Sequence, residues 1–147
     1  MKLYTNHEQI ILASSSKTRI NYLKQHFEKV LAVQHQIQEI KIKKDDSKRS
    51  FINLVKLLAK KKAESIMEYY PANIIIGSDQ ILVCDGKLIN KSHNLSEAKK
   101  NLMNLRGKKH TLISSTYVIK NKKFYFEETK KALMLFKNVS QKKIEDY

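Results

Sequence analysis

Residues 10–19 read Ile10-Ile11-Leu12-Ala13-Ser14-Ser15-Ser16-Lys17-Thr18-Arg19, and this stretch decides the fold. The apolar run at its start predicts a short buried strand, and the three serines predict a turn. A helical spacing of apolar residues follows, which predicts a helix with one buried face: Ile20, Leu23, Phe27 and Val30. A strand, a polar turn and a helix start together place backbone N–H groups and a helix dipole where they can bind an anion.

The next segments predict a strand, a loop and a long helix. Residues 31–37 alternate loosely and predict a second strand that ends at Glu39, and residues 41–50 are so highly charged that we expect an exposed loop. Apolar residues at helical spacing over 51–70 predict an amphipathic helix that Pro71 ends. Lys62 interrupts the apolar face of this helix, and its neighbours Ala59 and Ala63 are small.

The second half of the chain predicts mostly strands. The run 74–76 predicts a buried strand whose end is Gly77-Ser78-Asp79-Gln80, and Asp85-Gly86 predicts a tight hairpin. We expect further elements in this order: a helix capped by Ser96 and stopped by Gly107, a hairpin around 120–122, a separate strand at 132–136 and a helix opened by Ser140. Alternating strands and helices predict an α/β fold with a mixed sheet, built as one domain over residues 1–147.

Composition limits the class of protein. The net charge is +15, but only three of the 29 basic residues are arginine. Proteins that read base edges favour arginine. A solvated lysine-rich surface is therefore the preferred interpretation, and nucleic-acid binding is disfavoured. The single cysteine, Cys84, cannot form an internal disulfide, and we expect a buried, inert thiol in a reducing compartment. No apolar run is long enough for a membrane span, and we expect a cytoplasmic protein.

Two constellations can carry chemistry. Ser14, Ser16 and Arg19 can bind an anion at a helix start, and Asp79, at the end of a strand, can bind a metal or activate a water. Each has a plain alternative, a serine-rich helix cap with a surface arginine and an ordinary turn aspartate. Glu39, Lys62 and Lys91, taken singly, are interpreted as surface charges. The sequence contains no Cys/His cluster for zinc and no glycine-rich nucleotide-binding loop.

In order along the chain, these segments resemble the Maf family of nucleoside triphosphate pyrophosphatases. The resemblance includes Leu12 to Arg19, Glu39, Lys62-Ala63, Ile74 to Asp79, Lys91 and the Leu105-x-Gly107-x-x-His110 pattern. It implies a Maf/ITPase-like mixed sheet flanked by helices, with two lobes around a cleft. It also implies a house-cleaning hydrolase that cleaves a nucleoside triphosphate to a monophosphate and pyrophosphate. Gln80 after Asp79 resembles the subgroup that acts on 7-methyl-GTP.

The resemblance implies a role for each matching residue. Asp79 and Glu39 would be catalytic and would hold a divalent metal, Mg²⁺ or Mn²⁺, or Asp79 would be the base that activates water. The substrate-binding residues would be Ser14, Ser16, Arg19, Lys62, Gln80 and Lys91.

The chain also departs from the family pattern. Ile20 stands where a second arginine is common, Ser92 replaces the proline of a Lys-Pro pair, and the acidic pair is reduced to Gln38-Glu39. Family members continue well beyond the position of Tyr147, so we expect a chain that lacks the C-terminal part of the fold and whose free sheet edge favours a homodimer. The alternative functions are therefore an inactive nucleotide-binding or RNA-binding remnant of such an enzyme, and a plain lysine-rich RNA binder.

Overall fold

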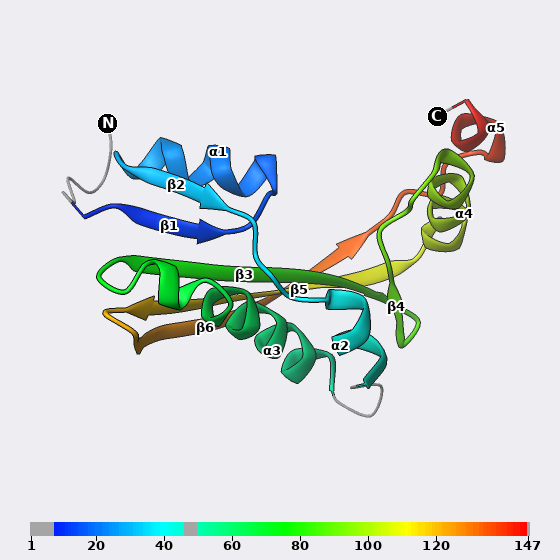
Figure 1. Ribbon diagram of the computed structural model, residues 1–147. Helices are drawn as coiled ribbons and strands as arrows, with labels where there is room; N and C mark the ends of the chain where they lie inside the picture. Colours follow the sequence, from blue (N-terminus) through cyan, green and yellow to red (C-terminus); the bar gives the residue numbers. More distant parts are fainter. Residues whose placement is uncertain (1–7, 46–49, 147) are drawn as a thin grey trace. The chain divides into compact units, whose positions relative to one another are not determined.

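The computed structural model describes residues 8–45 and 50–146, which form six strands and several helices (Figure 1). In chain order the elements are β1 (Ile10–Ala13), α1 (Lys17–His26), β2 (Val30–Val33), α2 (Glu39–Asp45), α3 (Phe51–Glu64), the 3-10 helix η1 (Met67–Tyr69), β3 (Ile74–Cys84), β4 (Lys87–Ile89), α4 (Leu95–Leu105), β5 (Lys109–Lys120), β6 (Lys123–Leu135) and α5 (Gln141–Glu145).

The strands form a mixed sheet in the order β2-β1-β3-β5-β6, with β4 paired to β3. β1 is parallel to both of its neighbours, since Ile10 pairs with Val30 on one side and with Ile74 on the other. β4 is antiparallel to β3. Helices flank the strands, so the predicted α/β class is confirmed.

The chain divides into two compact units, Met1–Asp79 with Ser115–Thr129, and Gln80–Ser114 with Lys130–Tyr147. We call them unit 1 and unit 2 and describe each by itself; the prediction of one domain over 1–147 stays a prediction. Unit 1 buries a cluster made by β1, β3, β5, the end of α3 and the residue before η1: Ile11, Ala13, Ala63, Ile66, Ile75 and Ile119. Unit 2 buries Ile81, Cys84, Leu105, Ile113 and Ile144. Among the described residues, no helix is long and apolar enough to cross a membrane.

Several local predictions are confirmed. β1 has the predicted bounds, Cys84 is a buried free thiol, and Ser140 caps α5 by accepting a hydrogen bond from Lys143 N–H. The β3–β4 hairpin turns at Asp85-Gly86, whose φ angles of 49° and 70° are those that a two-residue hairpin requires. Gly107 has a φ of 67° just after α4, as expected of a helix stop.

The predicted boundaries around Glu39 were wrong. β2 runs from Val30 to Val33. The sequence pattern had placed Val30 on the preceding helix, which ends at His26. Glu39 therefore does not end a strand: it is the first residue of α2, and the predicted loop 41–50 is helical as far as Asp45. Residues 46–49 lie outside the described part. α3 ends at Glu64, before Pro71, and η1 covers the rest of the predicted helix.

Three predictions in the second half were also wrong. Gly77-Ser78-Asp79-Gln80 is not the end of a strand, because β3 continues through it to Cys84. The segment at 132–136 is not a separate strand but the continuation of β6, which ends at Leu135. α4 is capped not by Ser96 but by Asn94, whose side chain accepts a hydrogen bond from Glu97 N–H.

Candidate functional site

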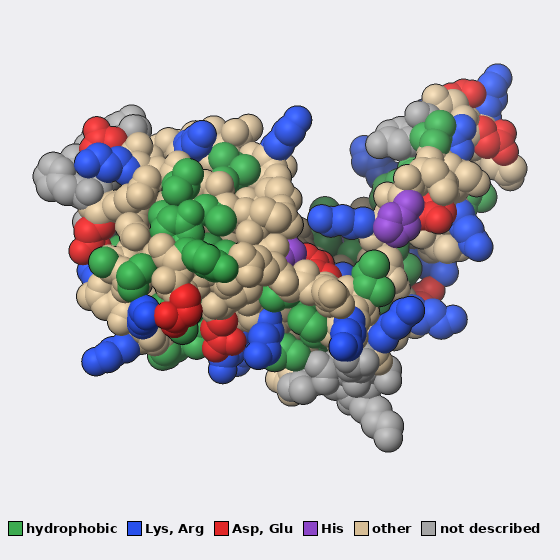
Figure 2. Space-filling view, in the orientation of Figure 1, with side chains coloured by type: hydrophobic (Ala, Val, Ile, Leu, Met, Phe, Trp, Pro, Cys, Tyr) green, Lys and Arg blue, Asp and Glu red, His purple; other side chains and the backbone are tan. Residues whose placement is uncertain are grey.

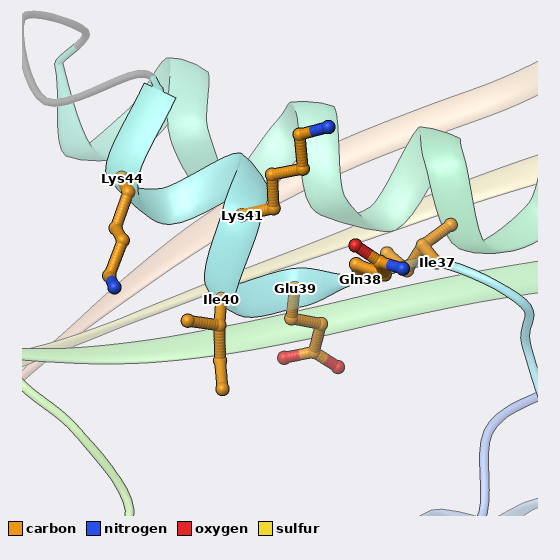
Figure 3. A pocket seen from close by; sticks show the side chains of 6 residues that line it. All are labelled: Ile37, Gln38, Glu39, Ile40, Lys41 and Lys44. Atoms are coloured by element: carbon orange, nitrogen blue, oxygen red, sulfur yellow. The ribbon is translucent and has the colours of Figure 1, made fainter.

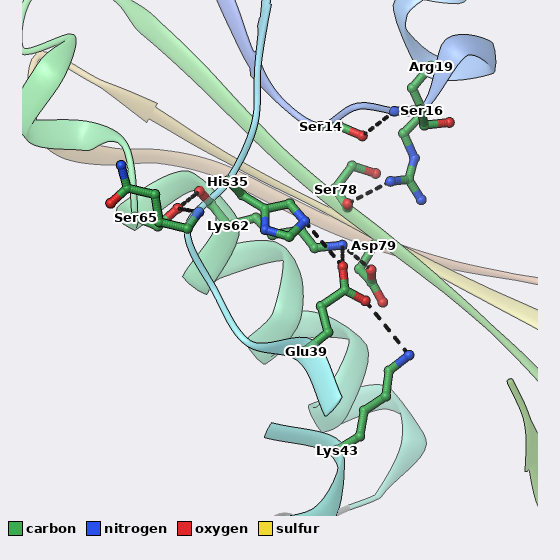
Figure 4. Close-up of polar contacts among 11 residues, drawn as sticks. Ser14, Ser16, Arg19, His35, Glu39, Lys43, Lys62, Ser65, Ser78 and Asp79 are labelled. Atoms are coloured by element: carbon green, nitrogen blue, oxygen red, sulfur yellow. Dashed lines mark hydrogen bonds and ion pairs between the residues drawn. The ribbon is translucent and has the colours of Figure 1, made fainter. Parts of the chain in front are cut away.

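Lys62 lies at the centre of a buried charge cluster in unit 1 (Figure 4). Its Nζ is 2.5 Å from Asp79 Oδ1 and 2.8 Å from Glu39 Oε1. Lys62 is 4% exposed and Asp79 is 5% exposed, so this ammonium has left water and depends on its two carboxylate partners. The structure thus brings together three of the residues that the sequence singled out, from α3, β3 and α2.

A close approach of α3 to β3 makes this contact possible. A Cβ built on Gly77 would lie 2.1 Å from the carbonyl oxygen of Ala59 and 2.9 Å from the Cβ of Ala63. Only glycine fits where the helix touches the strand backbone, and the two alanines keep the helix surface flat there. Lys62, which leaves the same face of α3, can therefore reach the side chain of Asp79 two residues further along β3.

Glu39 is fixed from several sides. Oε1 lies 3.2 Å from His35 Nε2 as well as near Lys62, and Oε2 lies 3.8 Å from Lys43 Nζ. Burial alone would raise the pKa of the Glu39 carboxyl, but the hydrogen bond and charge of Lys62, with Lys43 and His35, outweigh burial and lower it. Glu39 is therefore an ionised carboxylate beside a buried ammonium.

His35 is a member of the cluster that sequence reasoning missed. Burial, followed by the nearby charge of Lys62, lowers the pKa of the imidazole below its ordinary value of 6.5, although Glu39 and Asp79 act in the opposite direction. The ring is therefore neutral near pH 7. Its Nδ1 is buried and has no hydrogen-bond partner among the described residues. No motif marks this histidine, which lies between β2 and α2.

The three residues that the sequence predicts as an anion site, Ser14, Ser16 and Arg19, lie in the same unit. Ser14 is 5% exposed, and its Oγ accepts a hydrogen bond from Ser16 N–H at 3.1 Å. Ser16 occupies the N-cap position of α1 without a side-chain capping bond, so first-turn N–H groups of this helix stay available to an anion. Arg19 Nη1 donates to the carbonyl oxygen of Ser78 at 2.9 Å, which ties α1 to the residue before Asp79 (Figure 4).

The donor set of the cluster fits a hard divalent cation. Asp79 uses Oδ1 for Lys62, while its Oδ2 is buried and has no hydrogen-bond partner among the described residues. Glu39 supplies a second carboxylate. In residues 8–45 and 50–146, no group of three His, Cys, Asp or Glu side chains could hold a metal. Two carboxylates suit Mg²⁺ or Mn²⁺ sites that take their other ligands from water and phosphate.

Two hollows lie near predicted site residues. Glu39 lines an open hollow of about 710 Å³ in unit 1, together with Ile37, Gln38, Ile40, Lys41 and Lys44 (Figure 3). In unit 2, the exposed residues Gln80 and Lys91 line one hollow of about 260 Å³. Of the predicted site residues, Gln80 and Lys91 therefore belong to unit 2, and all the others belong to unit 1.

The comparisons with known proteins decide the family. A family model described as Maf-like protein matches residues 9–147. The chain belongs to the Maf-like proteins. The resemblance drawn from the sequence motifs is confirmed at this level.

Relatives of this Maf-like protein are named after one reaction. The chain is 32% identical, over 147 residues, to a nucleoside triphosphate pyrophosphatase of Legionella pneumophila, and the match covers all of this chain and 74% of that protein. It is 36% identical over 112 residues to a dTTP/UTP pyrophosphatase of Dictyoglomus thermophilum, a match that covers 76% of this chain and 56% of that protein. These names support the prediction of a nucleotide pyrophosphatase, a hydrolase acting on acid anhydrides.

A solved structure supports the fold. The Staphylococcus aureus Ham1 protein matches this Maf-like protein with a TM-score of 0.56 and 14% sequence identity, covering 86% of this chain and 69% of that one. At such an identity the likeness concerns the fold alone, and it confirms the predicted α/β architecture of a mixed sheet flanked by helices.

Proposed function

We propose that this chain hydrolyses a nucleoside triphosphate to a nucleoside monophosphate and pyrophosphate. The observation that supports this most is Asp79 Oδ2, a buried carboxylate oxygen without a hydrogen-bond partner in the described residues. Its sister oxygen is fixed by the Lys62 ammonium. A carboxylate oxygen that is buried, fixed in position and without a hydrogen-bond partner within the described part of the protein is well placed to act on a bound ligand.

The charge cluster would perform the central step. Water attacks one of the two phosphorus atoms of the anhydride between the α- and β-phosphates, and the bridging P–O bond breaks. The oxygen of water ends on the attacked phosphorus, and the products are a nucleoside monophosphate and pyrophosphate. Asp79 Oδ2 can accept the proton of that water or bind a cation, and both uses need the same free oxygen. A divalent metal ion would neutralise phosphate charge when bound, and Asp79 and Glu39 are the residues that would hold it.

The remaining predicted residues would bind the substrate. Ser14 and Ser16 offer hydroxyl groups at the start of α1, next to free N–H groups that favour an anion. The guanidinium of Arg19 makes one bond to Ser78 and retains further N–H donors for a phosphate oxygen. Lys62 adds a buried positive charge. In unit 2, Lys91 would bind a phosphate oxygen and Gln80 would contact the base.

We propose 7-methyl-GTP as the preferred substrate, on the support of Gln80 directly after Asp79. The Dictyoglomus relative is named for dTTP and UTP, so pyrimidine triphosphates are the main competitors. Pyrophosphate release should be measured with 7-methyl-GTP, GTP, dTTP and UTP, in Mg²⁺ or Mn²⁺ and again after chelation. We expect the highest kcat/KM with 7-methyl-GTP and loss of turnover after chelation. A higher kcat/KM with dTTP or UTP would reject the purine assignment.

The same assay separates catalysis from the alternatives. A chain that binds nucleotides but releases no pyrophosphate from any of them would be the inactive remnant. A plain RNA binder would show steep salt dependence on RNA and no preference for mononucleotides. On the face that Figure 2 shows, Lys and Arg side chains are spread out, so this face has no single basic patch of the kind that RNA binders use. The cytoplasmic location and the homodimer stay predictions, the second to be tested by analytical ultracentrifugation.

A further inference from the structure

The segment between β4 and α4 is irregular, yet it is firmly bound to the helix that follows it. Residues 90–94 form neither helix nor strand. His93 N–H donates to Glu97 Oε2 at 2.8 Å, and Asn94 Oδ1 accepts from Glu97 N–H at 2.8 Å, so the helix start is closed by reciprocal capping bonds. These bonds fix the C-terminal end of the segment.

Asn101, two turns along α4, fixes the other end. Its Nδ2 donates to the carbonyl oxygen of Asn90 at 3.2 Å and to Ser92 Oγ at 3.1 Å. One amide group therefore binds the residue before Lys91 and the residue after it. The backbone of Lys91 is held on both sides by the same side chain.

Lys91 itself is left unpaired. Its side chain is exposed, and its ammonium makes no hydrogen bond or ion pair within the described part of the chain. It lines the unit 2 hollow with Gln80, Ser92 and Asn101, and the apolar side chains of Leu105 and Leu112 line the same hollow. A backbone fixed on both sides that carries an exposed lysine lining a hollow suits the binding of an anion.

We propose that Asn101 is a positioning residue, which orders the Asn90–Ser92 backbone so that Lys91 can bind a phosphate group of the nucleotide. This inference rests on the proposed function, since that function assigns Lys91 to phosphate. Because the Asn90–Ser92 backbone is already ordered in the free protein, less conformational entropy is lost when the nucleotide binds. Ser92 takes part because its hydroxyl accepts one of the two bonds.

The test compares Asn101→Ala with Asn104→Ala, a matched truncation at an exposed position of the same helix. The readout is the dissociation constant for a triphosphate with a non-hydrolysable α,β-methylene bridge, measured by calorimetry. We expect Asn101→Ala to weaken binding about tenfold and Asn104→Ala to leave it unchanged within twofold. In the hydrolysis assay the loss should appear in KM with kcat nearly unchanged. Equal affinities for the two variants would overturn the inference.

Two further variants separate positioning from a general structural role. In a Lys91→Ala chain, Asn101→Ala should have no additional effect, because there is no ammonium left to position. Adding Ser92→Pro to the Asn101→Ala chain should bring its dissociation constant back to within about threefold of the wild-type value. Proline restricts the backbone directly, without the hydrogen bonds of Asn101. The proposal would be contradicted if the losses of affinity from Lys91→Ala and Asn101→Ala were additive, or if Ser92→Pro did not restore the affinity of the Asn101→Ala chain. Because affinity is the readout, a chain that binds the analogue but hydrolyses nothing would contradict the proposed function without touching this inference.

Discussion

The ammonium of Lys62 lies 2.5 Å from Asp79 Oδ1, and both residues are at least 95% buried. Lys62 also contacts Glu39, so one cation joins carboxylates from a helix and from the middle strand β3. Buried charges of this kind are expensive to leave unpaired. The geometry of the candidate site and the stability of unit 1 therefore depend on the same contact.

Replacing Lys62 with methionine should destabilise the protein. Lys62→Met keeps the length of the side chain but leaves Asp79 and Glu39 without their shared cation, and removing one partner of a buried pair costs about 3–5 kcal/mol. The free energy of unfolding in urea would measure this loss. Lys61→Met is the matched control on the same helix, because Lys61 is half exposed and its nearest ion pair, with Glu64, is 3.7 Å long. It should change stability by less than about 1 kcal/mol. Similar losses in both variants would contradict the assigned role of Lys62.

Gly77→Ala should separate α3 from β3. The added methyl group would lie 2.1 Å from the Ala59 carbonyl oxygen, so the helix must move and Lys62 must move with it. We expect a loss of about 1–3 kcal/mol, typical of overpacking, together with a clear drop in pyrophosphate release. Gly86→Ala is the control. A Cβ at position 86 would meet no atom within 4 Å, but the φ of 70° is unfavourable for alanine. This variant should therefore lose only about 1–2 kcal/mol of unfolding free energy and leave Lys62 undisturbed. Full activity in Gly77→Ala would contradict this prediction.

Stability should fall on acidification in two ranges. His35 has a pKa lowered from 6.5, so its neutral form stabilises the fold above 6.5 and this contribution is lost as the pH falls below that value. Glu39 has a pKa lowered from 4.5, so its contribution is lost only at lower pH, below 4.5. Urea unfolding across this range should show a slope in both windows.

Substitutions assign each window to its residue. His35→Asn should flatten the slope that begins below pH 6.5, whereas Glu39→Gln should flatten the slope that begins below pH 4.5. An unchanged slope in His35→Asn would mean that another group is responsible.

Much of unit 1 could be predicted from sequence because local patterns agree with tertiary packing there. The apolar run 10–13 forms the predicted strand, and Ala63 lies on the predicted buried face of α3. The interpretation of Lys62, taken singly, as a surface charge was wrong, because this side chain is buried and paired with Asp79. The Asp85-Gly86 hairpin was predictable because few dipeptides accept two positive φ angles.

The errors arose where polar residues hide a regular element. The polar run Gly77-Ser78-Asp79 looks like a strand end, but Ile75, Gly77, Asp79 and Ile81 are all buried and alternate with more exposed neighbours, the period of a continuous strand. The α2 segment Glu39–Asp45 is charged and lacks an apolar face: Ile40 is 67% exposed. His35 offered no signal, since its role arises only when α3 and α2 meet.

The most direct test of the central claim is pyrophosphate release by Asp79→Asn, measured beside the wild-type chain with 7-methyl-GTP and dTTP in the presence of Mg²⁺. The amide keeps the shape of the side chain but can neither accept the proton of a water as a carboxylate does nor bind a cation as strongly. We expect a folded protein whose kcat falls at least about 10²–10³-fold. Wild-type turnover in Asp79→Asn would contradict the assignment of this carboxylate as the reactive group.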